Sequence, residues 1–185
     1  MIRIIGGKYR GRKLKVFPGN DVRPTSDQVR EALFNLLSPL LNWDNMVVLD
    51  LYAGSGALGL EALSRGAKKA VFVEASRKHM TILKQNIELF SLEQTKFELA
   101  QEKAARWISR FADPGQQCLA FLDPPFYSNE YNLILEKLGL TPAIRTGSLI
   151  VVESNQTREI LFPENMDLLK HRRYGTVSLD ILRKC

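Results

Sequence analysis

The fold is decided by the stretch Val48-Leu49-Asp50-Leu51-Tyr52-Ala53-Gly54-Ser55-Gly56 (residues 48–56), an apolar run that leads into a glycine-rich turn. The run is short and apolar on both faces, which is typical of a parallel strand covered by helices on both sides. Together with Gly59, the turn satisfies the pattern G-x-G-x-x-G between a strand and a helix. The stretch therefore predicts an α/β fold whose ligand site begins at this turn.

Strand-like and helix-like segments alternate after this turn. Apolar runs at residues 46–51, 70–75, 118–123 and 148–153, with a weaker one at 95–100, predict strands, and helices are expected near residues 57–65, 77–91, 102–111 and 129–138. Residues 166–170 and 176–183 predict two further strands joined at Tyr174-Gly175. We therefore expect a doubly wound, mostly parallel sheet that ends in an antiparallel strand, with ligands bound beyond the carboxyl ends of its strands.

Residues 1–22 are expected to form a basic β-hairpin extension, and residues 23–185 the main domain. Apolar residues alternate with polar ones at both ends of the extension, and glycines between them favour a turn. Up to residue 23 the basic residues are Arg3, Lys8, Arg10, Arg12, Lys13, Lys15 and Arg23, against the single acid Asp21. A second basic cluster occupies residues 170–173. Each cluster indicates either contact with nucleic acid or solvated surface charge.

A helix is expected directly after the extension. Thr25 and Gln28 fit a capping box, and apolar residues follow at helical spacing from Val29 to Leu37.

The composition predicts one globular unit without membrane contact. The chain has 185 residues, 45% of them hydrophobic, and a net charge of +6. Neither a signal peptide nor an apolar run long enough to span a bilayer is evident, so we expect a cytoplasmic monomer. Both cysteines, Cys118 and Cys185, and both histidines, His79 and His171, are widely separated. This spacing predicts no disulfide and no metal site.

Acids at strand ends indicate what the glycine turn binds. Asp50 stands four residues before the first glycine, where its charge would repel the pyrophosphate of a nicotinamide dinucleotide. A cationic ligand is favoured there, and S-adenosylmethionine carries a sulfonium and an ammonium group. Glu74 ends the next expected strand, where a carboxylate can accept hydrogen bonds from ribose hydroxyls. The alternative for both acids is a helix cap or a surface charge.

Glu102 follows the third expected strand in the chain. Its carboxylate is a candidate partner for the adenine amino group of the same ligand. An exposed glutamate at a helix start is the alternative.

The segment Asp123-Pro124-Pro125-Phe126 follows another expected strand and so belongs to the same edge of the sheet. Proline fixes its own φ and restrains the residue before it, which makes the segment stiff. The Asp123 carboxylate and the Pro124 carbonyl are suited to accept both N–H groups of an exocyclic base amine, with Phe126 stacked on the base. A plain turn is the alternative. The segment predicts methylation of a base nitrogen, in a base that is unpaired or flipped.

These elements resemble the class I S-adenosylmethionine-dependent methyltransferases and, within them, the bacterial enzymes that methylate N2 of a guanine in 16S ribosomal RNA. The resemblance covers nearly the whole chain. It is carried by residues 3–12, Arg23-Pro24-Thr25, residues 30–35, residues 50–56, residues 123–126 and Tyr174-Gly175. Many members of that family have Tyr where this chain has Phe126, which keeps the stacking surface and removes a hydroxyl.

The resemblance implies a seven-stranded sheet, S-adenosylmethionine as cofactor, and 16S ribosomal RNA in the small subunit or its assembly intermediate as partner. The residues implied in cofactor binding are Asp50, Tyr52, Ala53, Gly54, Gly56, Glu74, Glu102, Asp123, Arg23 and Thr25. Those implied in RNA binding are Arg3, Lys8, Tyr9, Arg10, Arg12, Lys13 and Arg23. Residues 123–126 would form the catalytic site.

Other functions compete with this interpretation. An adenine-N6 or other amino methyltransferase acting on DNA or protein would use the same Asp-Pro-Pro site, although this chain has little room for a separate target-recognition domain. A non-catalytic RNA-binding assembly factor would need neither the strand-end acids nor Asp123-Pro124-Pro125. Asp50 makes an NAD-dependent oxidoreductase the weakest alternative.

Overall fold

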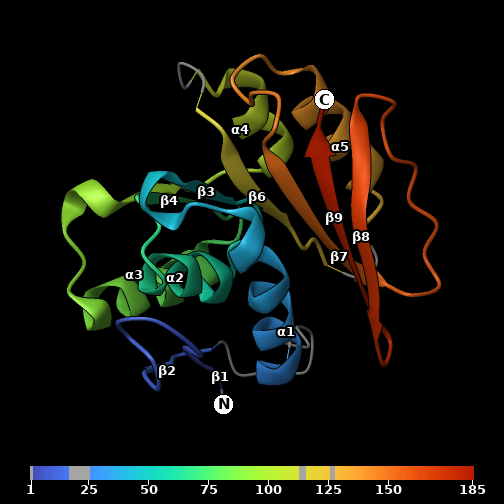
Figure 1. The fold of residues 1–185 in the computed structure, drawn as a ribbon. Helices are drawn as coiled ribbons and strands as arrows, with labels where there is room; N and C mark the ends of the chain where they lie inside the picture. The colour runs from blue at the N-terminus through green and yellow to red at the C-terminus, as the bar shows by residue number, and fades with distance from the viewer. Residues whose placement is uncertain (1, 17–25, 113–115, 126–127) are drawn as a thin grey trace.

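The computed structural model describes residues 2–16, 26–112, 116–125 and 128–185, and Figure 1 shows its fold. Its main sheet consists of β3 (Val47–Asp50), β4 (Lys69–Val73), β5 (Phe97–Ala100), β6 (Cys118–Leu122), β7 (Leu149–Asn155), β8 (Met166–Tyr174) and β9 (Val177–Lys184). The helices are α1 (Asp27–Leu37), α2 (Ala57–Ser64), α3 (Arg77–Phe90), α4 (Ala104–Arg110) and α5 (Tyr131–Leu140). A separate two-stranded sheet pairs β1 (Ile2–Arg3) with β2 (Lys13–Leu14).

The predicted fold class is confirmed. The strands are ordered β5-β4-β3-β6-β7-β9-β8, and all neighbours from β5 to β7 run parallel. β9 lies antiparallel between β7 and β8, so the last strand of the chain is inserted inside the sheet and β8 forms its edge. No helix in the described ranges is long and apolar enough to cross a bilayer.

Helices cover both faces of the sheet and form two hydrophobic cores. α1, α2 and α3 lie on one face, and α4 and α5 on the other (Figure 1). Successive strand residues alternate between the cores: Val48 belongs to the core under α1 to α3, and Leu49 to the opposite one. Because side chains alternate strictly, the residue that follows each strand also lies on a defined face of the sheet.

The start of α1 differs from the predicted capping box. Ser26, not Thr25, is the N-cap residue, and its Oγ accepts a hydrogen bond from the Val29 amide at 3.2 Å. Thr25 lies outside the described residues. The predicted N-cap lies one residue too early, because Thr and Ser are both common N-cap residues and the local pattern does not distinguish them.

The β1–β2 hairpin is fastened to the main domain by buried polar side chains. The Glu61 carboxylate on α2 accepts hydrogen bonds from the amides of Ile5 at 2.7 Å and Gly6 at 2.9 Å. Ser64, one turn further along α2, accepts from the Tyr9 amide at 2.9 Å. A two-stranded hairpin is not stable alone, so this attachment explains how so short a sheet keeps its shape.

Candidate active site

Four acids form a row at the carboxyl edge of the main sheet. They are Asp50 after β3, Glu74 after β4, Asp123 after β6 and Glu153 near the end of β7. Each stands two residues after a strand residue of the α1–α3 core, so all four fall on that face of the sheet. Glu153 was not predicted. Its signal was an acid that ends the apolar run of residues 149–152, the same pattern that identified the other three.

Asp50 is buried beneath the glycine turn and acts as a cap of α2. Its Oδ2 accepts a hydrogen bond from the Gly59 amide at 3.0 Å. Burial raises the pKa of its carboxyl to about 7, and the charge of Glu74 adds to the rise. The helix-cap alternative is therefore realised at this residue. Because the Gly59 amide donates to Asp50, this N–H group of the first turn of α2 is not available to a phosphate.

Glu74 closes the glycine turn from the neighbouring strand. One carboxylate oxygen accepts from the Gly54 amide at 2.9 Å, and the other from the Ser76 amide at 2.7 Å. The turn is further held by the hydrogen bond from the Ala53 amide to the Val73 carbonyl at 3.1 Å. Glu74 thus holds the first glycine in place and stands at the edge of the glycine turn.

The glycines of the turn serve different purposes. A Cβ on Gly56 would lie 2.5 Å from Leu83 Cδ1, and one on Gly59 would lie 2.3 Å from Phe72 Cε1, so both are required for packing. A Cβ on Gly54 would meet no described atom closer than 4.0 Å. Gly54 has φ +53°, a backbone conformation that favours glycine, and the space beside it is open.

Asp123 lies beside Asp50 and Glu153. The β3–β6 register pairs Asp50 with Phe121, and the β6–β7 register pairs Leu122 with Val152, so Asp123 and Glu153 follow on adjacent strands. Burial raises the pKa of Asp123 well above its ordinary value, and the charges of Glu153 and Asp50 act in the same direction. A carboxylate in this setting is a stronger proton acceptor than a solvated one.

The remainder of the predicted catalytic segment is described only in part. Pro124 is buried and Pro125 is exposed. Phe126 lies outside the described residues. No cis peptide bond occurs in the described ranges, so the two prolines continue the chain in the trans form.

Tyr52 links the two halves of the site. Its hydroxyl donates to the Glu130 carboxylate at 3.0 Å, which joins the glycine turn to the segment that follows Asp123-Pro124-Pro125. Burial raises the pKa of Tyr52, and the charge of Glu130 raises it further. Tyr52 is therefore a neutral donor, and Glu130 is a site residue that sequence reasoning missed.

Glu102 follows β5, whose Ala100 pairs with Val73 on β4, so it lies at the same edge of the sheet, after the strand next to that of Glu74. Glu102 forms ion pairs with Arg110 and, at 3.9 Å, with Arg106 on the helix that it precedes. Glu102 does precede α4, but its side chain is only 15% exposed, so it is not the exposed helix-start glutamate of the alternative. Its role toward adenine stays a prediction. Arg23 and Thr25 lie outside the described residues.

One side chain on α3, that of Asn86, is hydrogen-bonded both to the basic hairpin extension and to the glycine turn. Asn86, buried on α3, accepts a hydrogen bond from the Lys15 amide at 2.8 Å and donates to the Lys15 carbonyl at 2.9 Å. The same amide nitrogen donates to the Ser55 carbonyl at 2.8 Å. Asn86 was not predicted, because no local pattern marks it.

The predicted RNA-binding residues of the hairpin are mostly exposed. Arg12 lies over the rings of Tyr9 and Phe90 and donates to the Leu89 carbonyl at 3.0 Å. Arg3 pairs with Asp27 at 3.0 Å. Lys8, Arg10 and Lys13 are exposed. The hairpin therefore presents several cations, of which Arg12 is held by neutral groups.

Metal-binding geometry is not found in the part of the chain that the structure describes. No group of three or more His, Cys, Asp or Glu side chains there is arranged to hold a metal ion. Cys118 is buried and Cys185 exposed, both as free thiols.

Comparison with known proteins gives a family and close structural relatives. Residues 2–183 match the family described as Conserved hypothetical protein 95. The chain is 36% identical to "Ribosomal RNA small subunit methyltransferase D" of Haemophilus influenzae, over 96% of this chain and 91% of that protein. It is 35% identical to the protein of the same name in Escherichia coli K12, over 99% of this chain and 90% of that protein.

Solved structures share the fold. The structure of yhhF from Escherichia coli superposes with a TM-score of 0.85 and 34% identity, covering 99% of this chain and 97% of that chain. SMU.776, solved in complex with SAH, has a TM-score of 0.67 at 14% identity, covering 88% of this chain and 50% of that chain. The second similarity concerns the fold alone. The fold is that of the class I methyltransferases.

Proposed function

We propose the following function for this chain, which belongs to the Conserved hypothetical protein 95 family. The protein is a methyltransferase that uses S-adenosylmethionine to methylate small-subunit ribosomal RNA, at N2 of a guanine. The observation that carries this proposal is the register of β3 and β6, which sets the stiff Asp123-Pro124-Pro125 segment beside the glycine turn. The names of the Haemophilus influenzae and Escherichia coli relatives support the RNA substrate.

The residues around the glycine turn fit S-adenosylmethionine. The space beside Gly54 is open to a ligand, and Glu74 stands where a carboxylate can accept from ribose hydroxyls. Asp50 is a buried acid whose pKa is raised to about 7, so a cation placed near it would favour its ionised form. A dinucleotide pyrophosphate would add negative charge to a row that already holds four acids.

S-adenosylmethionine, when bound, supplies a methyl group on a cationic sulfur. The chain's own residues prepare the nitrogen that receives it. The Asp123 carboxylate and the Pro124 carbonyl accept hydrogen bonds from the two N–H groups of the base amine. These bonds orient the nitrogen so that its lone pair points toward the methyl group. Gain of the methyl group, with loss of the neutral thioether as the methyl–sulfur bond breaks, would make the nitrogen cationic and acidic, and the Asp123 carboxylate is placed to accept the proton that it releases. Its raised pKa suits it to that task.

The target base has to be unpaired or flipped, because a stacked base cannot enter a corner formed by backbone and carboxylate. The hairpin supports binding of the surrounding RNA through its exposed cations. The choice of guanine N2 over adenine N6 follows the sequence resemblance, since both amines present two N–H groups to the same acceptors.

The test is methylation of small ribosomal subunits that lack the modification. Purified protein is incubated with tritiated S-adenosylmethionine and these subunits, and the RNA is digested and examined by mass spectrometry. N2-methylguanine at one position is expected, and Asp123→Ala should abolish it. N6-methyladenine, or label found only in DNA, would favour the rival amino methyltransferases. Calorimetry without any heat of cofactor binding would favour a non-catalytic assembly factor.

A further inference from the structure

A cluster of basic residues on β8 has no part in the site described above. It consists of Lys170, His171, Arg172 and Arg173, and is referred to below as the β8 cluster. All four residues are exposed, and β8 is an edge strand of the main sheet. An edge strand carries cations either to prevent pairing with other chains or to bind a partner.

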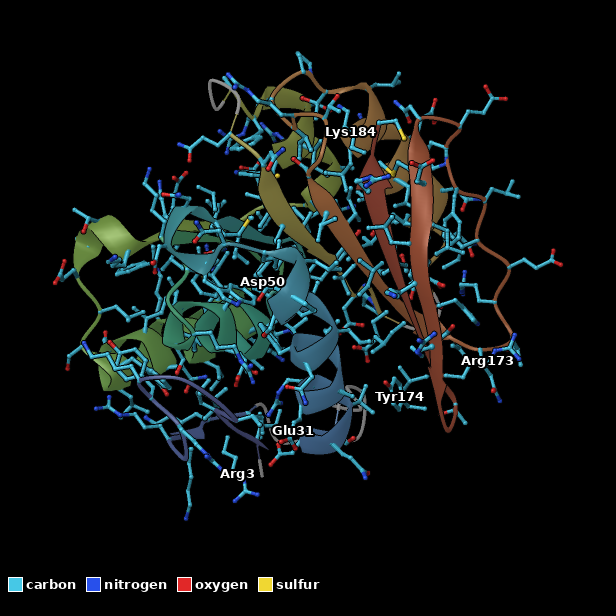
Figure 2. All side chains as sticks on the ribbon, viewed as in Figure 1. Arg3, Glu31, Asp50, Arg173, Tyr174 and Lys184 are labelled. Atoms are coloured by element: carbon cyan, nitrogen blue, oxygen red, sulfur yellow. The ribbon has the colours of Figure 1, made fainter. Side chains whose placement is uncertain are left out.

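Strand register places the β8 cluster at the carboxyl edge, in line with the acids. Leu179 on β9 is the partner of Glu153 on β7 and also of Arg172 on β8. Since partners across a sheet share a face and side chains alternate along a strand, Arg172 and Lys170 lie on the same face as Glu153 and Asp123. His171 and Arg173 start from the other face of this edge strand. Three strand spacings separate the backbones of Asp123 and Arg172, roughly 14 Å. In Figure 2, Arg173 and Tyr174 are labelled in the lower right part of the view and Arg3 at the bottom, to the left of them.

His171 holds the two arginines of the cluster in place. Its Nδ1 lies 2.5 Å from the buried Asp180 carboxylate, and its Nε2 accepts from Arg173 Nε at 3.2 Å. Its carbonyl oxygen accepts from Arg172 Nη1 at 2.8 Å. Each guanidinium uses one N–H group in these hydrogen bonds and has further donors to offer, while part of its rotational freedom is already lost.

The charge of these arginines is not neutralised locally. Within the described ranges some exposed arginines pair with carboxylates, namely Arg3 with Asp27, Arg106 and Arg110 with Glu102, and Arg183 with Asp167. In the same ranges neither Arg172 nor Arg173 forms an ion pair with an acid. Arg172, like Arg12 on the hairpin, is held by a backbone carbonyl, and Arg173 by the imidazole of His171, so neither guanidinium contacts a carboxylate directly in the described ranges and each is available to an anion.

We propose that the β8 cluster binds backbone phosphates of the RNA strand that carries the target base. The strand would then be held on two sides of the acid row, by the β1–β2 hairpin and by β8. Fixed guanidinium groups suit phosphate, which accepts two parallel N–H bonds from arginine. This inference rests on the proposed function, because it names a second contact for the same RNA.

The experiment compares three proteins: the wild type, the double variant Arg172→Gln/Arg173→Gln, and the control Lys68→Gln/Lys96→Gln. The control removes the same charge from exposed lysines that precede β4 and β5, at the opposite edge of the sheet. Binding of small-subunit ribosomal RNA is measured from about 50 to 200 mM salt, and methylation of small subunits is measured in parallel.

Losing two phosphate contacts should reduce the slope of log affinity against log salt by about 1.4 to 1.8 in the β8 variant. The control should keep the wild-type slope, and all three proteins should bind S-adenosylhomocysteine equally. A wild-type slope in the β8 variant, with or without aggregation, would overturn the inference and assign the cluster to edge protection. Absence of methylation and of salt-dependent RNA binding in the wild type would instead overturn the proposed function, and this inference with it.

Discussion

Asp50→Asn should make the protein more stable relative to the wild type as pH rises, while weakening cofactor binding. Burial raises the pKa of Asp50 from an ordinary 3.8 to about 7. The folded state therefore holds the proton over a range in which the unfolded state has lost it. Stability from this group is fully present below about pH 4 and is lost as pH rises through about 7.

The size of the effect follows from that interval. Each pKa unit corresponds to about 1.4 kcal/mol, so ionisation of Asp50 costs on the order of 4 kcal/mol of folding stability above pH 7. Between pH 5 and pH 8 the cost grows by roughly 2 to 3 kcal/mol. Asparagine has no such cost, and its carbonyl oxygen can still accept from Gly59. Burial of its NH₂ group changes the free energy of unfolding by an amount that does not depend on pH.

Urea denaturation of both proteins at pH 5, 6.5 and 8 measures this difference. The free energy of unfolding of Asp50→Asn minus that of the wild type should widen by about 2 to 3 kcal/mol from pH 5 to pH 8. Asp44→Asn removes an exposed aspartate and controls for net charge. A difference that stays constant with pH would refute the buried-acid argument. Affinity for S-adenosylhomocysteine that is unchanged in Asp50→Asn would refute its role toward the cofactor.

Three further predictions concern the acceptor corner, the hairpin and its attachment. Asp123→Ala should lower turnover to background while S-adenosylhomocysteine affinity in calorimetry stays nearly unchanged; wild-type turnover would exclude Asp123 from the chemistry. Lys8→Glu/Arg10→Glu should weaken RNA binding and flatten its salt dependence, and an unaltered salt slope would remove the hairpin from the interface. Asn86→Ala loses the three hydrogen bonds of a buried side chain and should cost about 2 to 4 kcal/mol in urea denaturation, whereas Gln85→Ala next to it should cost much less.

Local patterns were sufficient to predict the parts of the site that lie on single strands. Asp50, Glu74 and Asp123 each end an apolar run, and the rule that parallel strands present their carboxyl ends at one edge brought them together correctly. Glu153 obeys the same rule but was overlooked, because its run leads into no glycine or proline signal. The cap formed by Asp50 was foreseen only as an alternative, since choosing between a cap and a ligand contact requires the position of the Gly59 amide.

The sequence by itself determined the alternation of strands and helices, the glycine turn and the stiff Asp-Pro-Pro corner, because periodicity and backbone restraint act within a few residues. Only the tertiary structure decided that β9 enters the sheet between β7 and β8, and hence that Arg172 stands in line with Glu153. It also decided that Asn86 joins Lys15 to Ser55. These relations join segments that are distant in the chain, and strand order and packing bring them together.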